Sequence, residues 1–563
     1  MDEANPVSIF ESMNRMPLPS PATSRSRSLL RLPAAILGLA LGLGASAHAA
    51  PQINVPYERI LNSKNEPQNW LTWGGDYSAH RHSTLTQITP QNVGNMKAIW
   101  TYQQADTSKW EVTPIVVDGI MFISERPNIV TALDARTGRP IWNYRRPFPQ
   151  DVPICCGTPN RGVAILGDAI YLCTFDGHLV CLDANTGLER WDVVVEDYHL
   201  GYSLTAAPIA VKDKIVVGVA GAEFGIRGFI DAFDAKTGKR AWRFWTIPGE
   251  GEPGIETWGN TGSHKTGGGS TWVPGTYDPE TNLIYWGTGN PAPDYNGDNR
   301  PGDNLYTAAE VAIDADTGKL KWHFQFTPHD VHDWDACQVP VLFEAVVNGK
   351  LRKLLGHANR NAFYYVLDRT NGQFVAGSQF AKQTWSKGLD DSGRPILIPG
   401  LEPTQEGVLV YPGLGGSANW QPPSYSPTTG LMYVSAREDY GQHFFKIEQP
   451  YTVGGHFENG GGRNVLGSEP YGVIKALEAT TGKTVWEFPL QTATHGPVLS
   501  TITGLVFSGT AEGDFFALDA RSGKPLWRYP GGGAFYGGPV SYMVDGKQYV
   551  ATAIGAGLFV FGL

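Results

Sequence analysis

The chain has 563 residues and a formal net charge of −10, with 68 glycines, 17 tryptophans and 5 cysteines. An acidic balance argues against nucleic acid as a partner, because the phosphate backbone attracts basic proteins. The glycine and tryptophan content indicates a turn-rich, well-packed fold and not a disordered chain.

Residues 1–49 have the pattern of an export signal. Positive charge in "SRSRSLLR" precedes a short apolar run over 32–44, and "AHA" at 47–49 fits cleavage before Ala50. Residues 1–15 contain three acids, unlike the start of a signal, so Met16 is an alternative first residue. No later stretch reaches the roughly 18 apolar residues of a membrane helix. We expect a periplasmic protein without a membrane span, in which residues 50–563 form a single domain.

One phrase recurs along the chain: an apolar strand end, an Asp-x-x-Thr-Gly turn, and a strand that carries tryptophan. The copies are "ALDARTGRPIWNY" at 132, "CLDANTGLERWDV" at 181, "AFDAKTGKRAWRF" at 232, "AIDADTGKLKWHF" at 312, "ALEATTGKTVWEF" at 476 and "ALDARSGKPLWRY" at 517, with a weaker copy, "VLDRTNGQFV", at 366. Each predicts a hairpin in which glycine supplies the positive φ of the turn.

About eight units of four strands, with no comparable helical periodicity, predict an all-β fold: an eight-bladed β-propeller with four-stranded antiparallel blades. The interval between Gly372 and Gly482 leaves room for one further degenerate unit, near "YSPTTGLMYV" at 425. We expect the repeated tryptophans to pack one blade on the next. Function must then lie in residues that break the repeat.

Two adjacent cysteines, Cys155 and Cys156, stand out in "VPICCGTPNRG". Consecutive α-carbons lie about 3.8 Å apart, below the roughly 4.4–6.8 Å that ordinary disulfides prefer, so a bond between them would be strained. Two free thiols are the simpler interpretation, although an oxidising compartment favours the bond. The residues alone leave both states open.

Four segments break the repeat: "GVAGAEFGIRG" at 218, "TGGGSTWVPGTYDP" at 266, "YWGTGNPAPDYNGDNRPGDN" at 285 and "TPHDVHDWDACQ" at 327. They offer oxygen ligands of the kind that hard cations such as Ca²⁺ select. The candidate ligands are Glu223, Asn290, Asp330, Asp333 and Asp335.

These motifs occur in one order that is similar to a known family. The adjacent cysteines, "GAEFGIRG", "GTGNPAP", "RPGDN", "PHDVHDWD" and the Asp-x-x-Thr-Gly…Trp repeats together resemble the quinoprotein alcohol dehydrogenases, the methanol and ethanol dehydrogenase family, which use pyrroloquinoline quinone (PQQ). The resemblance runs over 69–562. It implies an eight-bladed propeller with PQQ and one metal ion near the axis.

The resemblance implies which residues bind PQQ. Cys155 and Cys156 would form a vicinal disulfide on one face of the quinone, with Trp272 stacked on the other. The carboxylates and quinone oxygens would be bound in the plane of the ring by polar side chains from several segments. These are Glu111, Arg161, Thr205, Ser270, Arg360 and Asn419.

The resemblance also implies a metal site formed by Glu223, Asn290 and Asp333, for Ca²⁺ or a lanthanide. Asp335 is an additional carboxylate, a pattern frequent among lanthanide-using members of the family. In an extended segment, residues two apart project to one side, so Asp333 and Asp335 are expected to face one ion. Asp333 would be the catalytic base, with Asp330 as the alternative.

Two histidines depart from the family pattern, and both leave the shape of the substrate open. His332 stands where tryptophan often precedes the catalytic aspartate, and His495 in "ATHGPVLS" stands where the family often has tryptophan. A histidine at either place is expected to be a packed, hydrogen-bonding residue. No disulfide between Cys173 and Cys181 is expected, because their sulfurs are expected on opposite faces of a hairpin.

The expected activity is oxidation of a small alcohol to an aldehyde or ketone. The metal would polarise a quinone carbonyl, Asp333 would take the alcohol proton, and hydride would pass to PQQ. Since the sequence contains no Cys-x-x-Cys-His, we expect no haem and a separate soluble electron acceptor, such as a c-type cytochrome. The oligomeric state is left open, with a homodimer as one candidate.

Two alternatives remain at the level of sequence. One is the same chemistry on a sugar or a bulky secondary alcohol, because the loops at 382–424 and 440–470 set the shape of the pocket. The other is a non-catalytic propeller scaffold, similar to the lipoprotein of the outer-membrane assembly machinery. A scaffold would need neither the vicinal cysteines nor the buried carboxylates, and it would carry a lipid-anchor cysteine, which does not follow the apolar run here.

Overall fold

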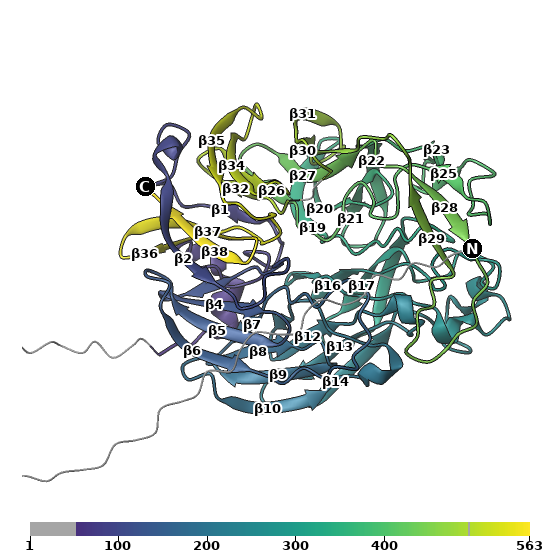
Figure 1. The fold of residues 1–563 in the computed structure, drawn as a ribbon, viewed down its shortest axis with the longest axis horizontal. Coiled ribbons are helices and arrows are strands. Elements are labelled where there is room, and N and C mark those ends of the chain that lie inside the picture. The colour runs from purple at the N-terminus through teal and green to yellow at the C-terminus, as the bar shows by residue number, and fades with distance from the viewer. Residues whose placement is uncertain (1–51, 494–495) are drawn as a thin grey trace, which may run out of the picture. The chain divides into compact units, whose positions relative to one another are not determined.

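The computed structural model describes residues 52–493 and 496–563. The expected signal peptide and His495 lie outside these residues. Strands make up almost all of the regular structure (Figure 1), and the described part contains one short α-helix, α1 (Tyr57–Leu61). The 3-10 helices are η1 (Ser63–Asn65), η2 (Val93–Asn95), η3 (Tyr198–Leu200), η4 (Ala222–Phe224), η5 (Ile255–Trp258) and η6 (Ser263–Thr266). None of the described helices is both long enough and apolar enough to cross a membrane.

Five four-stranded antiparallel sheets are built from strands that are consecutive in the chain. They contain β3 (Ile115–Val117), β4 (Ile120–Glu125), β5 (Ile129–Asp134) and β6 (Pro140–Arg145); β7 (Ala164–Leu166), β8 (Ala169–Cys173), β9 (His178–Asp183) and β10 (Glu189–Val194); β11 (Ile209–Val211), β12 (Lys214–Gly218), β13 (Phe229–Asp234) and β14 (Arg240–Trp245); β15 (Thr276–Asp278), β16 (Leu283–Gly287), β17 (Ala309–Asp314) and β18 (Leu320–Gln325); and β19 (Val341–Val347), β20 (Lys350–Ala358), β21 (Phe363–Asp368) and β22 (Phe374–Gln379).

Three further sheets join strands that are distant in the chain. One contains β26 (Ser424–Ser426), β27 (Leu431–Glu438), β30 (Tyr471–Glu478) and β31 (Thr484–Pro489). The next adds β1 (His82–Ser83), in parallel, to β32 (Leu499–Thr501), β33 (Leu505–Gly509), β34 (Asp514–Asp519) and β35 (Pro525–Pro530). The last pairs β2 (Lys97–Gln103) with β38 (Gly557–Gly562), followed by β37 (Lys547–Ile554) and β36 (Val540–Val544).

This architecture confirms the predicted β-propeller of four-stranded antiparallel sheets. The predicted repeat forms the hairpin between the third and fourth strands of a sheet. In the first copy, the Asp134 carboxylate accepts hydrogen bonds from the backbone N–H groups of Arg136 at 2.9 Å and Thr137 at 3.2 Å. Gly138 closes the turn with φ +73°, a conformation that side chains other than glycine's rarely adopt.

The repeated tryptophans pack one sheet on the next, as the sequence predicted. A Cβ on Gly187 would collide with the Trp142 ring, so this glycine is needed for close approach as well as for the turn. The Trp142 indole N–H also donates to the carbonyl oxygen of Ala184 in the same turn, at 3.1 Å. Trp242, Trp322, Trp486 and Trp527 make the same kind of hydrogen bond to a segment of the following sheet.

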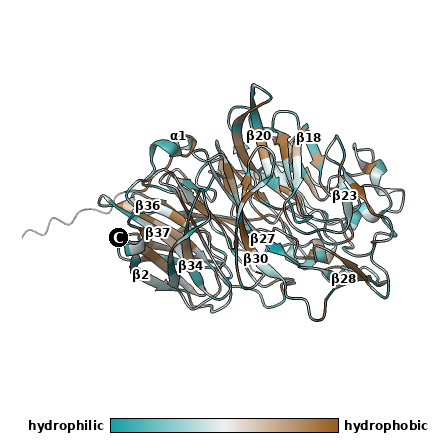
Figure 2. Ribbon diagram, turned by 90° about the horizontal axis from the view of Figure 1, so that it is seen from above, coloured by the Kyte–Doolittle hydropathy of each residue, from teal (hydrophilic) through white to brown (hydrophobic). Residues whose placement is uncertain are grey.

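An early strand and the last strand of the chain lie in one sheet. Figure 1 shows the dark-blue strand β2 beside the yellow strands β37 and β38. The pairing of β2 with β38 ties residue 97 to residue 562. Hydrophobic residues are frequent in strands such as β36 and β37 (Figure 2), and several clusters of buried apolar residues form the core.

The expectation of an additional blade between Gly372 and Gly482 is wrong. The turn near residue 425 belongs to the same sheet as the repeat at 476, because β26 and β27 pair with β30 and β31. The interval is long because it also holds two small sheets. They contain β23 (Ser386–Leu389) and β24 (Pro395–Leu397), and β25 (Val408–Val410), β28 (Gln442–Lys446) and β29 (Gly460–Asn464).

Candidate active site

A cavity of about 560 Å³ brings together most of the predicted site residues. They come from connections between strands, most of which join different sheets, whereas Glu223 and Arg360 lie in connections within one sheet. The predicted residues that line the cavity are Glu111, Cys155, Cys156, Arg161, Thr205, Glu223, Trp272, Asp333, Asp335, Arg360 and Asn419. Residues that are far apart in the sequence therefore surround one space large enough for a tricyclic cofactor.

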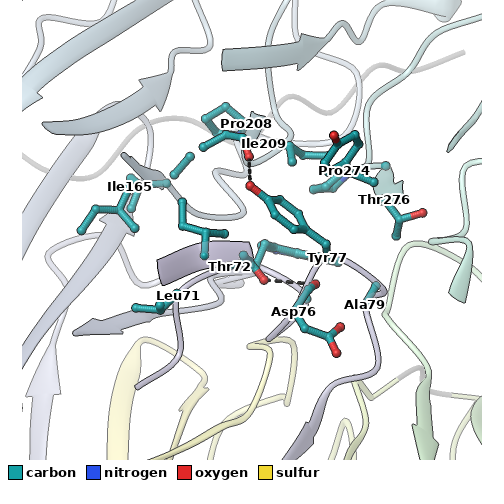
Figure 3. Close-up of a pocket in the computed structure, with 18 residues that line it drawn as sticks. Leu71, Thr72, Asp76, Tyr77, Ala79, Ile165, Pro208, Ile209, Pro274 and Thr276 are labelled. Atoms are coloured by element: carbon teal, nitrogen blue, oxygen red, sulfur yellow. Dashed lines mark hydrogen bonds between the residues drawn. The ribbon is translucent and has the colours of Figure 1, made fainter. Parts of the chain in front are cut away.

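Two other cavities contain none of the predicted site residues. One, of about 30 Å³, is lined by side chains such as Leu71 and Ile165, next to Tyr77, whose hydroxyl group donates to the Ala210 carbonyl oxygen at 2.7 Å (Figure 3). This space is about the size of one water molecule. The other, of about 520 Å³, lies next to Tyr57 and Trp191.

Cys155 and Cys156 form a disulfide in the structure, which decides between the two states that the residues alone left open. Both cysteines are exposed and line the cavity. Their α-carbons are 3.8 Å apart. The remaining cysteines, Cys173, Cys181 and Cys337, are buried and unbonded, as expected for the first two.

We predict that this disulfide is present in the active enzyme and is needed for efficient turnover, because it gives one face of the cavity a fixed apolar surface. Peptide mapping under non-reducing conditions should find the peptide containing both cysteines lighter by two hydrogen atoms than its reduced form. Free alkylation of both thiols in fully active enzyme would contradict this prediction.

Trp272 lines the same cavity and is held by hydrogen bonds at both its side chain and its backbone. Its indole N–H donates to Asp335 Oδ2 at 2.9 Å. Its carbonyl oxygen accepts from Thr205 Oγ1 and Arg161 Nη1, each at 3.3 Å. The Arg161 guanidinium carbon lies 4.8 Å from the centroid of the Trp272 ring, a cation–π contact. The ring is therefore fixed before any ligand enters.

Several cationic side chains of the cavity keep unused donors. Arg161 pairs with Glu111 at 2.7 Å, and the Lys109 amino group is 3.7 Å from the same carboxylate. The buried Nε groups of Arg161, Arg360 and Arg437 have no hydrogen-bond partner among the described residues. Buried donors of this kind favour an anionic ligand. This donor set, in one cavity with a disulfide and an indole, fits a flat tricarboxylate such as PQQ.

Arg360 connects the two predicted carboxylates. Its guanidinium group donates to Asp335 Oδ2 at 2.8 Å, to Asp333 Oδ1 at 3.2 Å and to the Asp333 carbonyl oxygen at 2.6 Å. The extended geometry expected at Asp333 is wrong, since its φ is +58°, in the left-handed region. Both carboxylates nevertheless bind one guanidinium group, which holds them on the same side of the cavity.

Glu223 and Asp333 have raised pKa values in the cavity. Burial raises the pKa of Glu223 to about 7, and the nearby charges of Asp335 and Glu458 add to this effect. Burial also raises the pKa of Asp333 well above its usual range, although Arg360 opposes the shift. Groups that hold a proton more tightly than usual are candidates for acid–base chemistry or for cation binding.

The structure places Glu223 against the disulfide. One of its carboxylate oxygens and both sulfur atoms lie within 4.8 Å of one another, and the oxidised sulfurs are not available as thiolate ligands. In the part of the chain that the structure describes, the oxygens of Glu223, Asp333 and Asp335 are not all within that distance of one another. A cation bound by all three must draw these side chains together.

Two predicted residues lie behind the wall of the cavity. Asn290 and Ser270 are buried and are not among the lining residues. The backbone N–H of Asn290 donates to Asp335 Oδ1 at 2.7 Å, and its side-chain amide donates to the Pro291 carbonyl oxygen at 3.3 Å. The backbone hydrogen bond to Asp335 therefore connects Asn290 to the acidic groups of the cavity.

Asn419 and His332 have local structural contacts. The Asn419 amide donates to the Gly415 carbonyl oxygen at 2.8 Å and accepts from the Trp420 backbone N–H at 2.8 Å, within its own loop. His332 is buried, and its ring lies 4.5 Å from the Trp334 ring, as expected for a packed residue. Burial lowers the pKa of His332 to about 4, so this ring is neutral.

Sequence reasoning missed several residues of the cavity; Tyr295 lies in the segment at 285 without having been singled out, and the others lie outside the four segments that break the repeat. They are Lys109, Tyr295, Trp420, Arg437, Tyr440 and Glu458. The sequence could have indicated Arg437. It follows the apolar run "LMYVSA" in β27, and a charged side chain in such a strand needs a partner. Burial lowers the pKa of Arg437 to about 10, with the neighbouring Arg360 adding to the shift.

Comparison with known proteins agrees with this geometry. Residues 70–379 match the family model described as glucose/ethanol/alcohol dehydrogenase, beta-propeller domain, and residues 470–559 match a model of the outer membrane protein assembly factor BamB. The chain is 38% identical over 540 residues to the quinoprotein alcohol dehydrogenase PedH of Pseudomonas putida. The aligned region covers 91% of this chain and 89% of PedH. The chain belongs to the family of PQQ-dependent alcohol dehydrogenases.

Two solved structures are also similar over most of the chain. The quinohemoprotein alcohol dehydrogenase of Comamonas testosteroni has a TM-score of 0.85 and 35% identity, covering 90% of this chain and 82% of that chain. A europium-containing methanol dehydrogenase has a TM-score of 0.84 and 31% identity, covering 90% of this chain and 100% of that chain.

The expectation of no haem is contradicted by these relatives. Three proteins that are each 37% identical to the chain, two from Pseudomonas putida and one from Comamonas testosteroni, are named quinohemoprotein alcohol dehydrogenases. A missing Cys-x-x-Cys-His sequence bears only on one kind of covalent attachment, because other haems are held through axial ligands. The exclusion of haem was therefore wrong.

Proposed function

We propose that the protein is a periplasmic dehydrogenase that uses PQQ and one cation to oxidise an alcohol to an aldehyde or ketone. The observation that carries this proposal is the convergence of Asp333, Asp335 and Arg360 with the vicinal disulfide and Trp272 around one cavity. When bound, PQQ supplies the acceptor for the hydride of the alcohol carbon, and the cation supplies a Lewis acid.

Asp333 is the proposed base. Its carboxylate is directed toward Arg360 and lines the cavity, where a substrate hydroxyl group can reach it. Asp330 is a weaker candidate, because its carboxylate already accepts the backbone N–H groups of His332 at 3.0 Å and Trp334 at 2.7 Å. These two bonds hold the loop in which Asp333 lies, so we assign Asp330 a positioning role.

The proposed cofactor contacts follow from the cavity. Cys155 and Cys156 would cover one face of the quinone and Trp272 the other, while buried cationic groups bind its carboxylates. The in-plane contacts are assigned to Glu111, Arg161, Thr205, Ser270, Arg360 and Asn419. The cation would be bound by Glu223, Asn290, Asp333 and Asp335. Oxygen donors of this kind suit both Ca²⁺ and a lanthanide, and europium in a similar methanol dehydrogenase keeps the second alternative open.

The proposed propeller has eight blades in a single domain over 50–563. Eight sheets of four or five strands among the described residues support this count. Contacts between neighbouring sheets support closure of the ring. The Trp100 ring packs against Gly138, and the Trp527 indole N–H donates to the Met96 carbonyl oxygen. A closed ring leaves no unpaired sheet at either end.

The similarity to BamB does not favour a scaffold function. It covers residues 470–559, which contain copies of the repeat but none of the proposed site residues.

A separate soluble protein, such as a c-type cytochrome, is the proposed electron acceptor, and a homodimer is the proposed assembly to test.

Reconstitution tests the proposed function. Purified protein should reduce an artificial dye with an alcohol only when PQQ and a cation, Ca²⁺ or La³⁺, are both present. Primary alcohols, bulky secondary alcohols and sugars should be compared as substrates, because the chain leaves this choice open. Protein that binds PQQ and a cation but reduces no dye with any of these substrates would contradict the proposal.

A further inference from the structure

Two titratable residues in the interior, Glu310 and His357, have no role in the proposed reaction and do not line the cavity. Glu310 lies in β17 and His357 in β20, so they belong to different sheets. Both are fully buried, and Glu310 Oε2 is 3.2 Å from His357 Nδ1. Both oxygens of Glu310 and the Nδ1 of His357 have no aligned hydrogen-bond partner among the described residues. Since buried polar groups are almost always paired, each is the natural partner of the other.

A pair buried this deeply is stable only without a net charge, because a buried charge without a partner is costly. Burial raises the pKa of Glu310 well above its usual range and lowers that of His357 to about 3, so neither group is charged on its own. The pair is neutral when it holds two protons, one between Glu310 and Nδ1 and the other on Nε2. The second proton makes Nε2 a hydrogen-bond donor.

Gln338 receives this donor. Its Oε1 atom is 3.2 Å from His357 Nε2, and its Nε2 atom donates to the Asp335 carbonyl oxygen at 3.2 Å, which fixes the end of the amide that faces the ring. Asn359 Nδ2 lies 3.3 Å from the same ring nitrogen. It is itself a donor, because Asn359 Oδ1 accepts from the Asn361 backbone N–H at 3.0 Å. Gln338 Oε1 is therefore the acceptor of the Nε2 proton.

The imidazole ring and the glutamine are held in the interior. The Phe326 ring stacks on the His357 ring, with centroids 4.3 Å apart and 25° between the planes. Gln338 is 2% exposed. The contacts from Glu310 to Asp335 thus run through buried side chains, where hydrogen bonds are stronger than in water.

Asp335 is the point at which these contacts meet the proposed site. Its carboxylate accepts from the Trp272 indole N–H at 2.9 Å and from the Arg360 guanidinium group at 2.8 Å. Both of these groups line the cavity. A shift of the backbone at Asp335 would therefore move the indole and the guanidinium group, and a misplacement of about 1 Å can cost roughly 100-fold in rate.

We propose that Glu310 and His357 are positioning residues for the cavity. They act through Gln338, which holds the backbone at Asp335 and, with it, the indole and guanidinium groups that this carboxylate binds. The expected effect on turnover rests on the proposed function. The positioning itself is a property of the protein without a cofactor, so it can be measured separately.

The indole N–H signal of Trp272 measures this positioning in full-length, cofactor-free protein labelled with ¹⁵N-tryptophan, and Trp272→Phe assigns the signal. Glu310→Gln should leave the signal in place, because the new amide donates to Nδ1 and Nε2 keeps its proton. Glu310→Leu removes the partner of Nδ1. The ring can then accept from Asn359 at Nε2, Gln338 loses its donor, and the Trp272 signal should shift.

Turnover per bound PQQ is the second readout, at saturating alcohol and cation and well below the melting temperature. Glu310→Leu should lower kcat by roughly 10–100-fold, the range typical of losing an orienting group behind a site, and Glu310→Gln should retain most of it. Gln338→Leu should have the same effect. The double variant should be no worse than either single variant, because both residues act through the same contacts.

Asp278→Asn is the matched control. The Asp278 carboxylate is buried and links the same two sheets through its ion pair with Arg369 at 2.8 Å, but neither residue lines the cavity. This variant should lower the melting temperature, while the Trp272 signal stays in place and kcat remains within about twofold of wild type.

The outcomes separate positioning from general stability. A Trp272 signal that stays in place in Glu310→Leu, or that moves equally in Asp278→Asn, would overturn the proposal. A double variant whose loss is the product of the two single losses would overturn it as well. If Glu310→Leu does not fold, Gln338→Leu breaks the same contacts and gives the same test. Wild-type protein that reduces no dye would overturn the proposed function, and the Trp272 signal would still decide the positioning.

Discussion

Asp333→Asn is expected to lower kcat by about 10²–10⁴-fold, the usual contribution of a general base. The substitution should leave the fold and PQQ binding largely intact, because Arg360 keeps its hydrogen bond to the Asp333 carbonyl oxygen at 2.6 Å and its ion pair with Asp335 at 2.8 Å. An amide of the same size cannot accept the proton of the alcohol. Dye-linked turnover and the absorbance of bound PQQ measure the two properties separately.

Asp330→Asn is the control for this variant. Its carboxylate accepts two backbone N–H groups, so its loss should lower the free energy of unfolding more than Asp333→Asn does. Near-normal turnover of Asp333→Asn, with PQQ bound, would move the base to Asp330 or Asp335.

Asp335→Ala is expected to have the second largest effect, on both stability and cation preference. The variant leaves the buried Arg360 guanidinium group with Asp333 as its remaining ion-pair partner, and it removes the acceptor of the Trp272 indole N–H. Removing one member of a buried ion pair lowers the free energy of unfolding by about 3–5 kcal/mol. We expect about 3 kcal/mol here, because Asp333 still compensates part of the charge.

If Asp335 also binds the cation, La³⁺-supported activity should fall more than Ca²⁺-supported activity in the same variant. The measurement is dye reduction by wild type and variant reconstituted with each ion, together with denaturant unfolding. Asp335→Asn retains one acceptor oxygen and should keep more of the stability than Asp335→Ala. A parallel loss of both activities in Asp335→Ala would assign Asp335 a purely structural role and leave the cation to the other ligands.

The repeat predicted the hairpins and their packing, because both depend on residues close together in the sequence. Asp134 to Gly138 form a turn through their own backbone, and Trp142 needs only a glycine turn in the next copy. The sheet that joins β2 to β38 was not predicted as a unit, because β2 and β38 lie at opposite ends of the chain and contain no Asp-x-x-Thr-Gly turn. Closure of this sheet depends on long-range pairing, which local patterns do not encode.

The motifs predicted residues that line one cavity, but they did not predict the contacts that each residue makes. Adjacent cysteines and "HDVHD" are visible in the sequence, whereas the three hydrogen bonds to Asp335 come from residues 25 to 63 positions away. The structure also leaves one buried oxygen of Asp294 without a hydrogen-bond partner among the described residues. Spacing along the chain cannot reveal which of several acids is left without a partner.

A crystal structure of the protein grown with PQQ and Ca²⁺ or La³⁺ would test the central claim most directly. The account predicts that the quinone ring lies between the Cys155–Cys156 disulfide and Trp272, with the cation bound by Glu223, Asn290 and Asp333. PQQ bound elsewhere, or a cation that contacts none of these three residues, would contradict it.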